Sequence, residues 1–108
     1  MSKKFYFTKD QIKDLVEGKG SCFATDEITV KGRKVGYMYK EKPDNQTDSG
    51  WRFMAGDETE EYMNDPENMA IYDVNTIANY DQAILPLLDS PVGSAFIRNS
   101  SGVLVEDK

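Results

Sequence analysis

The sequence predicts an α+β fold, a mainly antiparallel sheet flanked by a few short helices. Two patterns lead to this prediction. Short runs rich in β-branched and aromatic residues recur along the chain, separated by turns too short for a parallel crossover. Between them lie brief stretches with helical spacing, bounded by capping residues, glycine or proline. The chain has 108 residues, 39% of them hydrophobic, which suits one domain with one core.

The first twenty residues are predicted to form an extension that carries one helix and packs on the rest of the chain. Residues 8–17 have the required pattern, because Thr8 precedes Gln11 by three positions, as in a capping box. The apolar residues Ile12, Leu15 and Val16 would then form one stripe. Residues 21–108 are predicted to form a single α+β domain.

The next part of the chain reads as β structure. We expect a strand at 21–25, and then a hairpin that joins 28–30 to 35–39 with Gly32 in its turn. A polar loop follows, and a strand is expected at 51–55. Four aromatic residues of this region are expected in the core, with an aromatic contact patch as the alternative: Tyr37, Tyr39, Trp51 and Phe53.

The second half alternates short helices with strands. A short helix is expected to start within 57–60, which resembles a capping box, and to stop near Asp65 because Pro66 follows. Pro86 prevents one long helix after the next strand, so two short helical turns are expected, with Asp81 capping the second. The remaining segments, in order, are a strand at 69–74, the helical turns at 75–81 and 82–88, and a terminal hairpin of 93–99 with 103–106.

Charge is distributed unevenly along the chain. The net charge is −6, yet residues 53–97 contain nine Asp and Glu and no Lys or Arg. An acidic field of this kind repels the phosphates of nucleic acids and attracts basic partners. We therefore expect no nucleic-acid binding, although the basic turn at 31–34 could touch phosphate.

The residue types needed for several chemistries are missing. With no histidine, neither a Ser-His-Asp nor a Cys-His pair can form, and one cysteine cannot build a zinc site. Cys22 lies in an apolar strand, which indicates a buried, inert thiol. The loop from Asp44 resembles a calcium loop, but Ser49 and Ala55 occupy positions that require glycine and glutamate. No catalytic residue, metal or cofactor is predicted.

Nothing in the sequence predicts a membrane partner. The basic start of the chain is not followed by a long apolar segment, and no run of apolar residues approaches the length of a membrane span. The cytoplasm is the expected location.

Carboxylates gather near the short helix that precedes Pro66. They have two interpretations, a solvated helix face or a docking surface for a basic partner. We add two acids of the preceding loop. The candidate partner-binding residues are Glu58, Glu60, Glu61, Asp65, Asp44 and Asp48.

Several runs together resemble one bacterial family. The most specific are Gly50-Trp51-Arg52-Phe53 and Tyr72-Asp73-Val74-Asn75-Thr76, which occur in this order within a resemblance that spans about residues 21–97. The chain is similar to the immunity protein thirty-three family, a former domain of unknown function from polymorphic toxin systems. One departure is Gln82, where we would expect a proline, a residue that acts there only as a local helix stabiliser.

The resemblance implies a protein-binding module that neutralises a cognate bacterial toxin by occluding it, and it brings no catalytic residues. The partner would be a protein toxin with a basic surface. Two alternatives stay open: a regulatory domain for a housekeeping partner, and a small ligand-binding or enzymatic domain. A deep pocket would favour the latter if it were lined by several of Asp73, Asn75, Thr76, Asn79 and Asp81.

Overall fold

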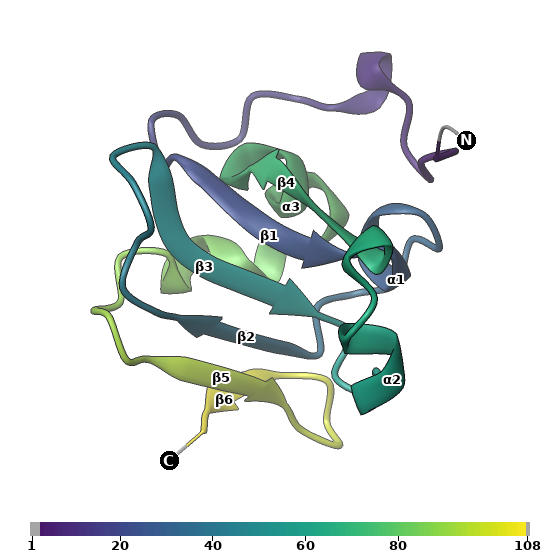
Figure 1. The fold of residues 1–108 in the computed structure, drawn as a ribbon. Coiled ribbons are helices and arrows are strands. Elements are labelled where there is room, and N and C mark those ends of the chain that lie inside the picture. Colours follow the sequence, from purple (N-terminus) through teal and green to yellow (C-terminus); the bar gives the residue numbers. More distant parts are fainter. Residues whose placement is uncertain (1–2, 108) are drawn as a thin grey trace.

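The computed structural model describes residues 3–107 and contains one six-stranded sheet. Figure 1 shows short helices at the ends of the strands and behind the sheet. The strands are β1 (Ser21–Thr25), β2 (Tyr37–Lys40), β3 (Asp48–Met54), β4 (Met69–Asp73), β5 (Ala95–Arg98) and β6 (Leu104–Glu106). The α-helices are α1 (Asp26–Thr29), α2 (Glu60–Met63) and α3 (Val74–Tyr80), and the 3₁₀ helices are η1 (Lys9–Gln11), η2 (Pro66–Asn68) and η3 (Gln82–Leu87).

The sheet has the strand order β4-β1-β3-β2-β5-β6. Neighbouring strands are antiparallel except β1 and β3, which run parallel. The α+β class with a mainly antiparallel sheet is therefore confirmed. The parallel pair arises because the chain leaves β1 through α1, forms β2, and returns along β3 between the two.

Only one face of the sheet carries a helical layer. The helices α3 and η3 lie behind the sheet in Figure 1, and the core fills the space between them and the strands. Val74, Ile77 and Ala78 recur at the spacing that places them on one side of α3, and all three are fully buried. Their partners from the strands and from η3 include Cys22, Ala24, Met38, Trp51, Phe53 and Ile84.

The predicted hairpin of 28–30 with 35–39 is wrong. Residues Asp26–Thr29 form α1 instead, and β2 pairs with β3 and β5. Ile28 and Thr29 are both fully buried, so the helical conformation of α1 allows their β-branched side chains to pack in the core. This tertiary contact outweighs the preference of such residues for strands.

The predicted helix at 8–17 is also wrong beyond its first turn. The capping interaction forms, since Gln11 Oε1 accepts a hydrogen bond from the Thr8 N–H, but the helix ends at Gln11. Side chains of α3 capture the next amides: Asn79 binds the N–H of Lys13, and Asn75 binds those of Leu15 and Val16. These bonds hold the segment extended along α3.

The remaining elements agree well with the sequence. The strand β4, the short α2 capped by Thr59, and the terminal β5–β6 hairpin all form where they were expected. Asp81 caps η3 by accepting a hydrogen bond from Ala83 N–H, as predicted. The strand β3 begins at Asp48, three residues earlier than expected. Within residues 3–107, no helix is both long enough and apolar enough to cross a membrane.

Asp81 joins three parts of the fold. Besides capping η3, its carboxylate accepts hydrogen bonds from the Val35 N–H and from the Arg98 guanidinium, and the residue is 4% exposed. Asp73 makes the same kind of cap on α3, but it is exposed and accepts from Asn75 N–H. The two aspartates therefore share a local role and differ in burial.

Replacing Asp81 with alanine should cost much more stability than the same change at Asp73. We expect Asp81→Ala to lower the free energy of unfolding by about 3 kcal/mol or more, because it leaves Arg98 without its carboxylate. Asp73→Ala should cost about 1 kcal/mol, the usual value for a lost helix cap. Urea unfolding followed by circular dichroism measures both. Equal losses would contradict the connecting role given to Asp81.

Candidate partner-binding surface

The face of the sheet opposite α3 carries no helical layer, and its side chains form two cross-strand rows. One row runs from Ile71 through Phe23 and Arg52 to Tyr39 and Ala95. The other runs from Met54 through Tyr37 to Ile97 and Val105. We call these residues, together with Thr25 and Met69, the open face. It is the face turned toward the viewer in Figure 1.

The open face is largely apolar and partly exposed. Ile71 is 64% exposed, Ile97 44% and Val105 38%. Tyr37 and Tyr39, which were expected in the core, lie half-buried on this face with ring centroids 5.9 Å apart. Trp51 and Phe53 do lie in the core. Ile71 lies at the β4 edge of the sheet, and Ile97 and Val105 lie together near the β6 edge. Exposed apolar side chains that gather on one face mark interaction surfaces.

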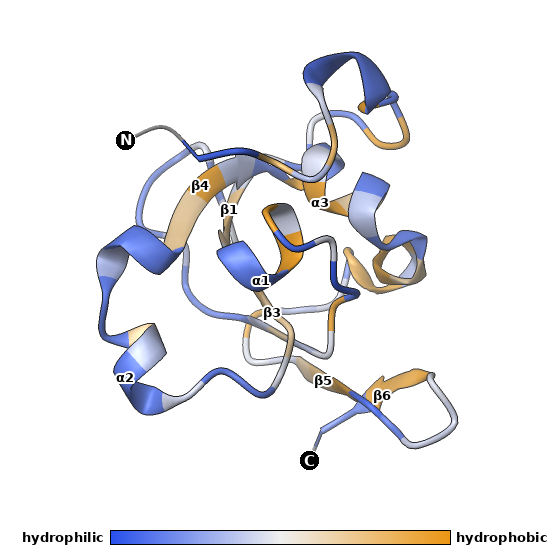
Figure 2. Ribbon diagram, turned by 90° about the vertical axis from the view of Figure 1, so that its right-hand side faces the viewer, coloured by the Kyte–Doolittle hydropathy of each residue, from blue (hydrophilic) through white to orange (hydrophobic). Residues whose placement is uncertain are grey.

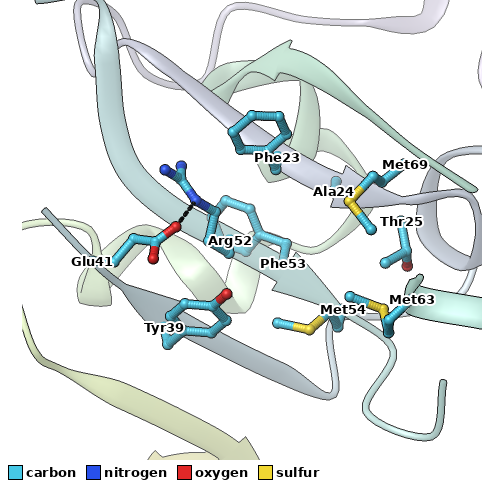
Figure 3. Close-up of a pocket in the computed structure, with 10 residues that line it drawn as sticks. All are labelled: Phe23, Ala24, Thr25, Tyr39, Glu41, Arg52, Phe53, Met54, Met63 and Met69. Carbon is cyan, nitrogen blue, oxygen red and sulfur yellow. Dashed lines mark hydrogen bonds and ion pairs between the residues drawn. The ribbon is translucent and has the colours of Figure 1, made fainter. Parts of the chain in front are cut away.

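A hollow of about 190 Å³ lies on the open face where α2 meets the sheet. Figure 3 shows its lining, with Tyr39 and Phe23 on one side and three methionines on the other. Met54 comes from β3, Met63 from α2 and Met69 from β4. Methionine side chains adapt their shape to different partners, which suits a contact surface. The complete lining is Phe23, Ala24, Thr25, Tyr39, Glu41, Arg52, Phe53, Met54, Met63 and Met69.

Arg52 is the central cation of the open face. Its Nη1 and Nη2 donate to the two carboxylate oxygens of Asp48, each at 2.9 Å, and its Nε donates to Glu41 Oε2 at 2.6 Å. The guanidinium also lies 4.6 Å from the centre of the Phe23 ring. A forked pair of this kind fixes both side chains in direction. The Arg52 guanidinium donates hydrogen bonds to the Asp48 carboxylate and thereby lowers the pKa of Asp48.

A bulge in β3 makes this pairing possible. Ser21 pairs with Asp48 and Phe23 with Arg52, so β3 contains two more residues than β1 over this stretch. Gly50 lies in the bulge with φ +91°, a region that favours glycine. A Cβ added there would lie 2.3 Å from the carbonyl oxygen of Glu41. Glycine at this position therefore lets the chain bring Asp48 back toward Arg52.

The cluster around Arg52 remains acidic. Asp44 Oδ2 is 3.9 Å from Arg52 Nη2, so three carboxylates surround one guanidinium. The side chains of Glu41 and Asp44 are 50% and 71% exposed, respectively. Arg52 itself is only 5% exposed. A partner would therefore meet carboxylates at this edge of the hollow, rather than the cation beneath them.

The six predicted partner-binding acids fall into two groups. Asp48 is buried against Arg52, and Glu58 accepts hydrogen bonds from Thr25 Oγ1 and from the backbone of Ala55 and Gly56. These two carboxylates act within the protein. The other four are exposed: Glu60 and Glu61 on α2, Asp65 just after it, and Asp44 beside Arg52. In Figure 2, α2 lies at the margin of the sheet and carries hydrophilic colouring over most of its length.

A second hollow, of about 390 Å³, lies near the basic turn and is lined by Arg33, Lys34 and Arg98. Arg33 donates to Glu27 and to both carboxylate oxygens of Asp57, while Arg98 donates to Asp81. Lys34 Nζ donates to the carbonyl oxygen of Tyr80 at 3.2 Å. Arg33 and Arg98 are therefore paired with carboxylates, whereas Lys34 is hydrogen bonded to a neutral carbonyl and keeps its charge.

The polar residues that would serve a small ligand have structural roles. Asp73 and Asp81 cap helices, and Asn75 and Asn79 hold the N-terminal segment. Neither they nor Thr76 line the two hollows described above. Cys22 is 1% exposed, and burial raises the pKa of its thiol. Among residues 3–107, no group of three or more Cys, Asp and Glu side chains is placed to hold a metal ion.

Comparison with known proteins decides the family. The family model described as "Immunity protein Imm33 domain" matches residues 22–108. The chain belongs to this family. No curated protein and no solved structure matches it. The matched region contains the sheet apart from Ser21 of β1, as well as α1–α3 and both hollows. Residues 3–20 include η1 and the segment that lies along α3.

Breaking the buried pair of the open face should destabilise this immunity-family domain. We expect Asp48→Asn to lower the free energy of unfolding at pH 7 by about 3–5 kcal/mol, because Arg52 then loses its buried counterion. Lys19→Ala breaks the pair with Asp89, whose side chain is 88% exposed, and should cost less than about 1 kcal/mol. Urea unfolding measures both variants. Losses of unfolding free energy of similar size would contradict the role given to the buried pair.

The cost of Asp48→Asn should depend on pH. The pKa of Asp48 is lowered in the folded state, so the carboxylate contributes its full stabilisation above its ordinary value of 3.8. That contribution declines as pH falls below about 4. The difference in unfolding free energy between the wild type and Asp48→Asn should be constant from pH 5 to 8 and shrink below pH 4. A constant difference down to pH 2.5 would contradict the ion pair.

Proposed function

We propose that this chain neutralises a cognate bacterial toxin by binding it and covering the surface that the toxin's substrate must reach. The observation that carries the proposal is membership of an immunity-protein family over residues 22–108. Occlusion needs a stable contact surface and requires no chemistry from the immunity protein itself. We place this action in the cytoplasm, where a chain with one buried cysteine needs no oxidising environment.

The charge distribution supports a partner with a basic surface. Residues 53–97 carry no Lys or Arg, and α2 presents Glu60 and Glu61 to solvent. Asp65 follows them in the turn between α2 and η2. Clustered charge of one sign attracts an oppositely charged partner over distances of about 10 Å at moderate salt. The acidic helix therefore supplies attraction during the approach of the toxin.

A growth assay tests the proposal. Any toxin domain found in the neighbouring open reading frames would be expressed in a bacterial host with and without the immunity chain. We expect growth arrest by the toxin alone, rescue on co-expression, and a 1:1 complex on size-exclusion chromatography of an inactive toxin variant. A toxin that still arrests growth and forms no complex with the purified chain would overturn the proposal.

Reversing the charge of α2 should slow association with the toxin. We expect the triple variant Glu60→Lys, Glu61→Lys, Asp65→Lys to lower the association rate constant by about tenfold or more at 20 mM salt. This difference should become small at 0.5 M salt, where charges are screened. Stopped-flow fluorescence measures the rates. Glu58 is left unchanged because its carboxylate holds the backbone of Ala55 and Gly56.

A second triple variant controls for net charge. Asp10→Lys, Asp14→Lys and Glu17→Lys add the same charge at exposed positions of the N-terminal segment, which lies far from α2 in Figure 1. We expect a much smaller effect on association. Equal slowing by both triples would assign the attraction to net charge and remove the role given to α2.

A further inference from the structure

The hollow on the open face differs in kind from the acidic helix beside it. Its lining is mainly apolar, with the three methionines, Phe23 and Tyr39 as its large side chains. Its single cation, Arg52, is satisfied by Asp48 and Glu41 and is nearly inaccessible. Burial, and secondarily the carboxylate of Glu41, raise the pKa of Tyr39, so its hydroxyl stays neutral at physiological pH.

We propose that this hollow receives one large apolar or aromatic side chain of the toxin, flanked in the toxin by lysine or arginine residues. This inference rests on the proposed function and names the anchor point within it. The hollow has a volume of about 190 Å³, and large aromatic side chains are the groups that bury the most surface on entering such a space. Hot spots of protein interfaces are often single side chains that fill such pockets at the centre of a contact.

Charge complementarity identifies the flanking residues of the occupant. Glu41, Asp44 and Asp48 surround one guanidinium, which leaves a net charge of −2 beside the hollow. On the opposite side, α2 contributes Met63 to the lining and carries Glu60 and Glu61 at its start. Lysine or arginine at both sides of the inserted apolar residue would therefore meet carboxylates.

The anchor and the acidic helix should affect different rate constants. Long-range attraction acts before contact and sets association, while a buried apolar contact must be broken for the complex to separate. Truncation of the hollow should therefore raise the dissociation rate constant with little change in association. An effect on dissociation alone would distinguish a contact inside the hollow from attraction by a charged surface.

The test uses the toxin identified by growth rescue, in an inactive form, and surface plasmon resonance. We expect Met63→Ala and Tyr39→Ala each to raise the dissociation rate constant by at least tenfold. Met63→Trp, which fills the hollow instead of emptying it, should weaken binding as strongly. Ile97→Ala and Val105→Ala remove exposed apolar side chains from the same face outside the hollow, and each should change dissociation less than threefold.

Thermal unfolding of each variant checks that the fold persists, and a double-mutant cycle identifies the occupant. Truncation of the inserted toxin residue should be strongly non-additive with Met63→Ala, and that residue should be large, apolar and flanked by Lys or Arg. If folded hollow variants bind and dissociate like the wild type while growth is still rescued, the anchor is wrong and the proposed function stands. A partner residue that is acidic or small would also overturn the anchor. Absence of any toxin complex would instead overturn the proposed function.

Discussion

The ion pair between Arg52 and Asp48 is the constraint on which the open face depends. A guanidinium below an apolar surface is tolerated only when its donors are satisfied, and here a forked carboxylate and Glu41 satisfy them. The β3 bulge, with Gly50 within it, brings Asp48 back toward Arg52. The same cluster places exposed carboxylates at the edge of the hollow, so one arrangement accounts for the stability of the face and for its charge.

Much of the fold was predictable because its signals are local. The cap at Asp81, the stop at Pro66 and the terminal hairpin follow from short-range chemistry, and all three appear as expected. The predictions were wrong where contacts between residues far apart in the sequence determine the local structure. Ile28 becomes helical because the core buries it, and the segment after Gln11 stays extended because Asn75 and Asn79 bind its backbone. Neither contact can be inferred from the sequence of the segment whose conformation it determines.

The candidate surface was only partly predictable for the same reason. The sequence pointed to the acids of α2 and to a strand at 51–55, with Trp51 and Phe53 in the core. It did not indicate that Arg52 and Met54 would face outward, because that depends on which face the helices cover. The internal roles of Asp48 and Glu58 also follow from tertiary hydrogen bonds. The sheet therefore has two faces, one packed against α3 and η3 and one that stays partly exposed.

Methionine methyl NMR tests the contact surface most directly. Met54, Met63 and Met69 line the hollow, whereas Met38 is fully buried in the core on the other side of the sheet and provides an internal reference. On saturation with the inactive toxin, the account predicts large changes in the methyl resonances of the first three and little change for Met38. Unchanged resonances of Met54, Met63 and Met69 in a saturated complex would contradict it.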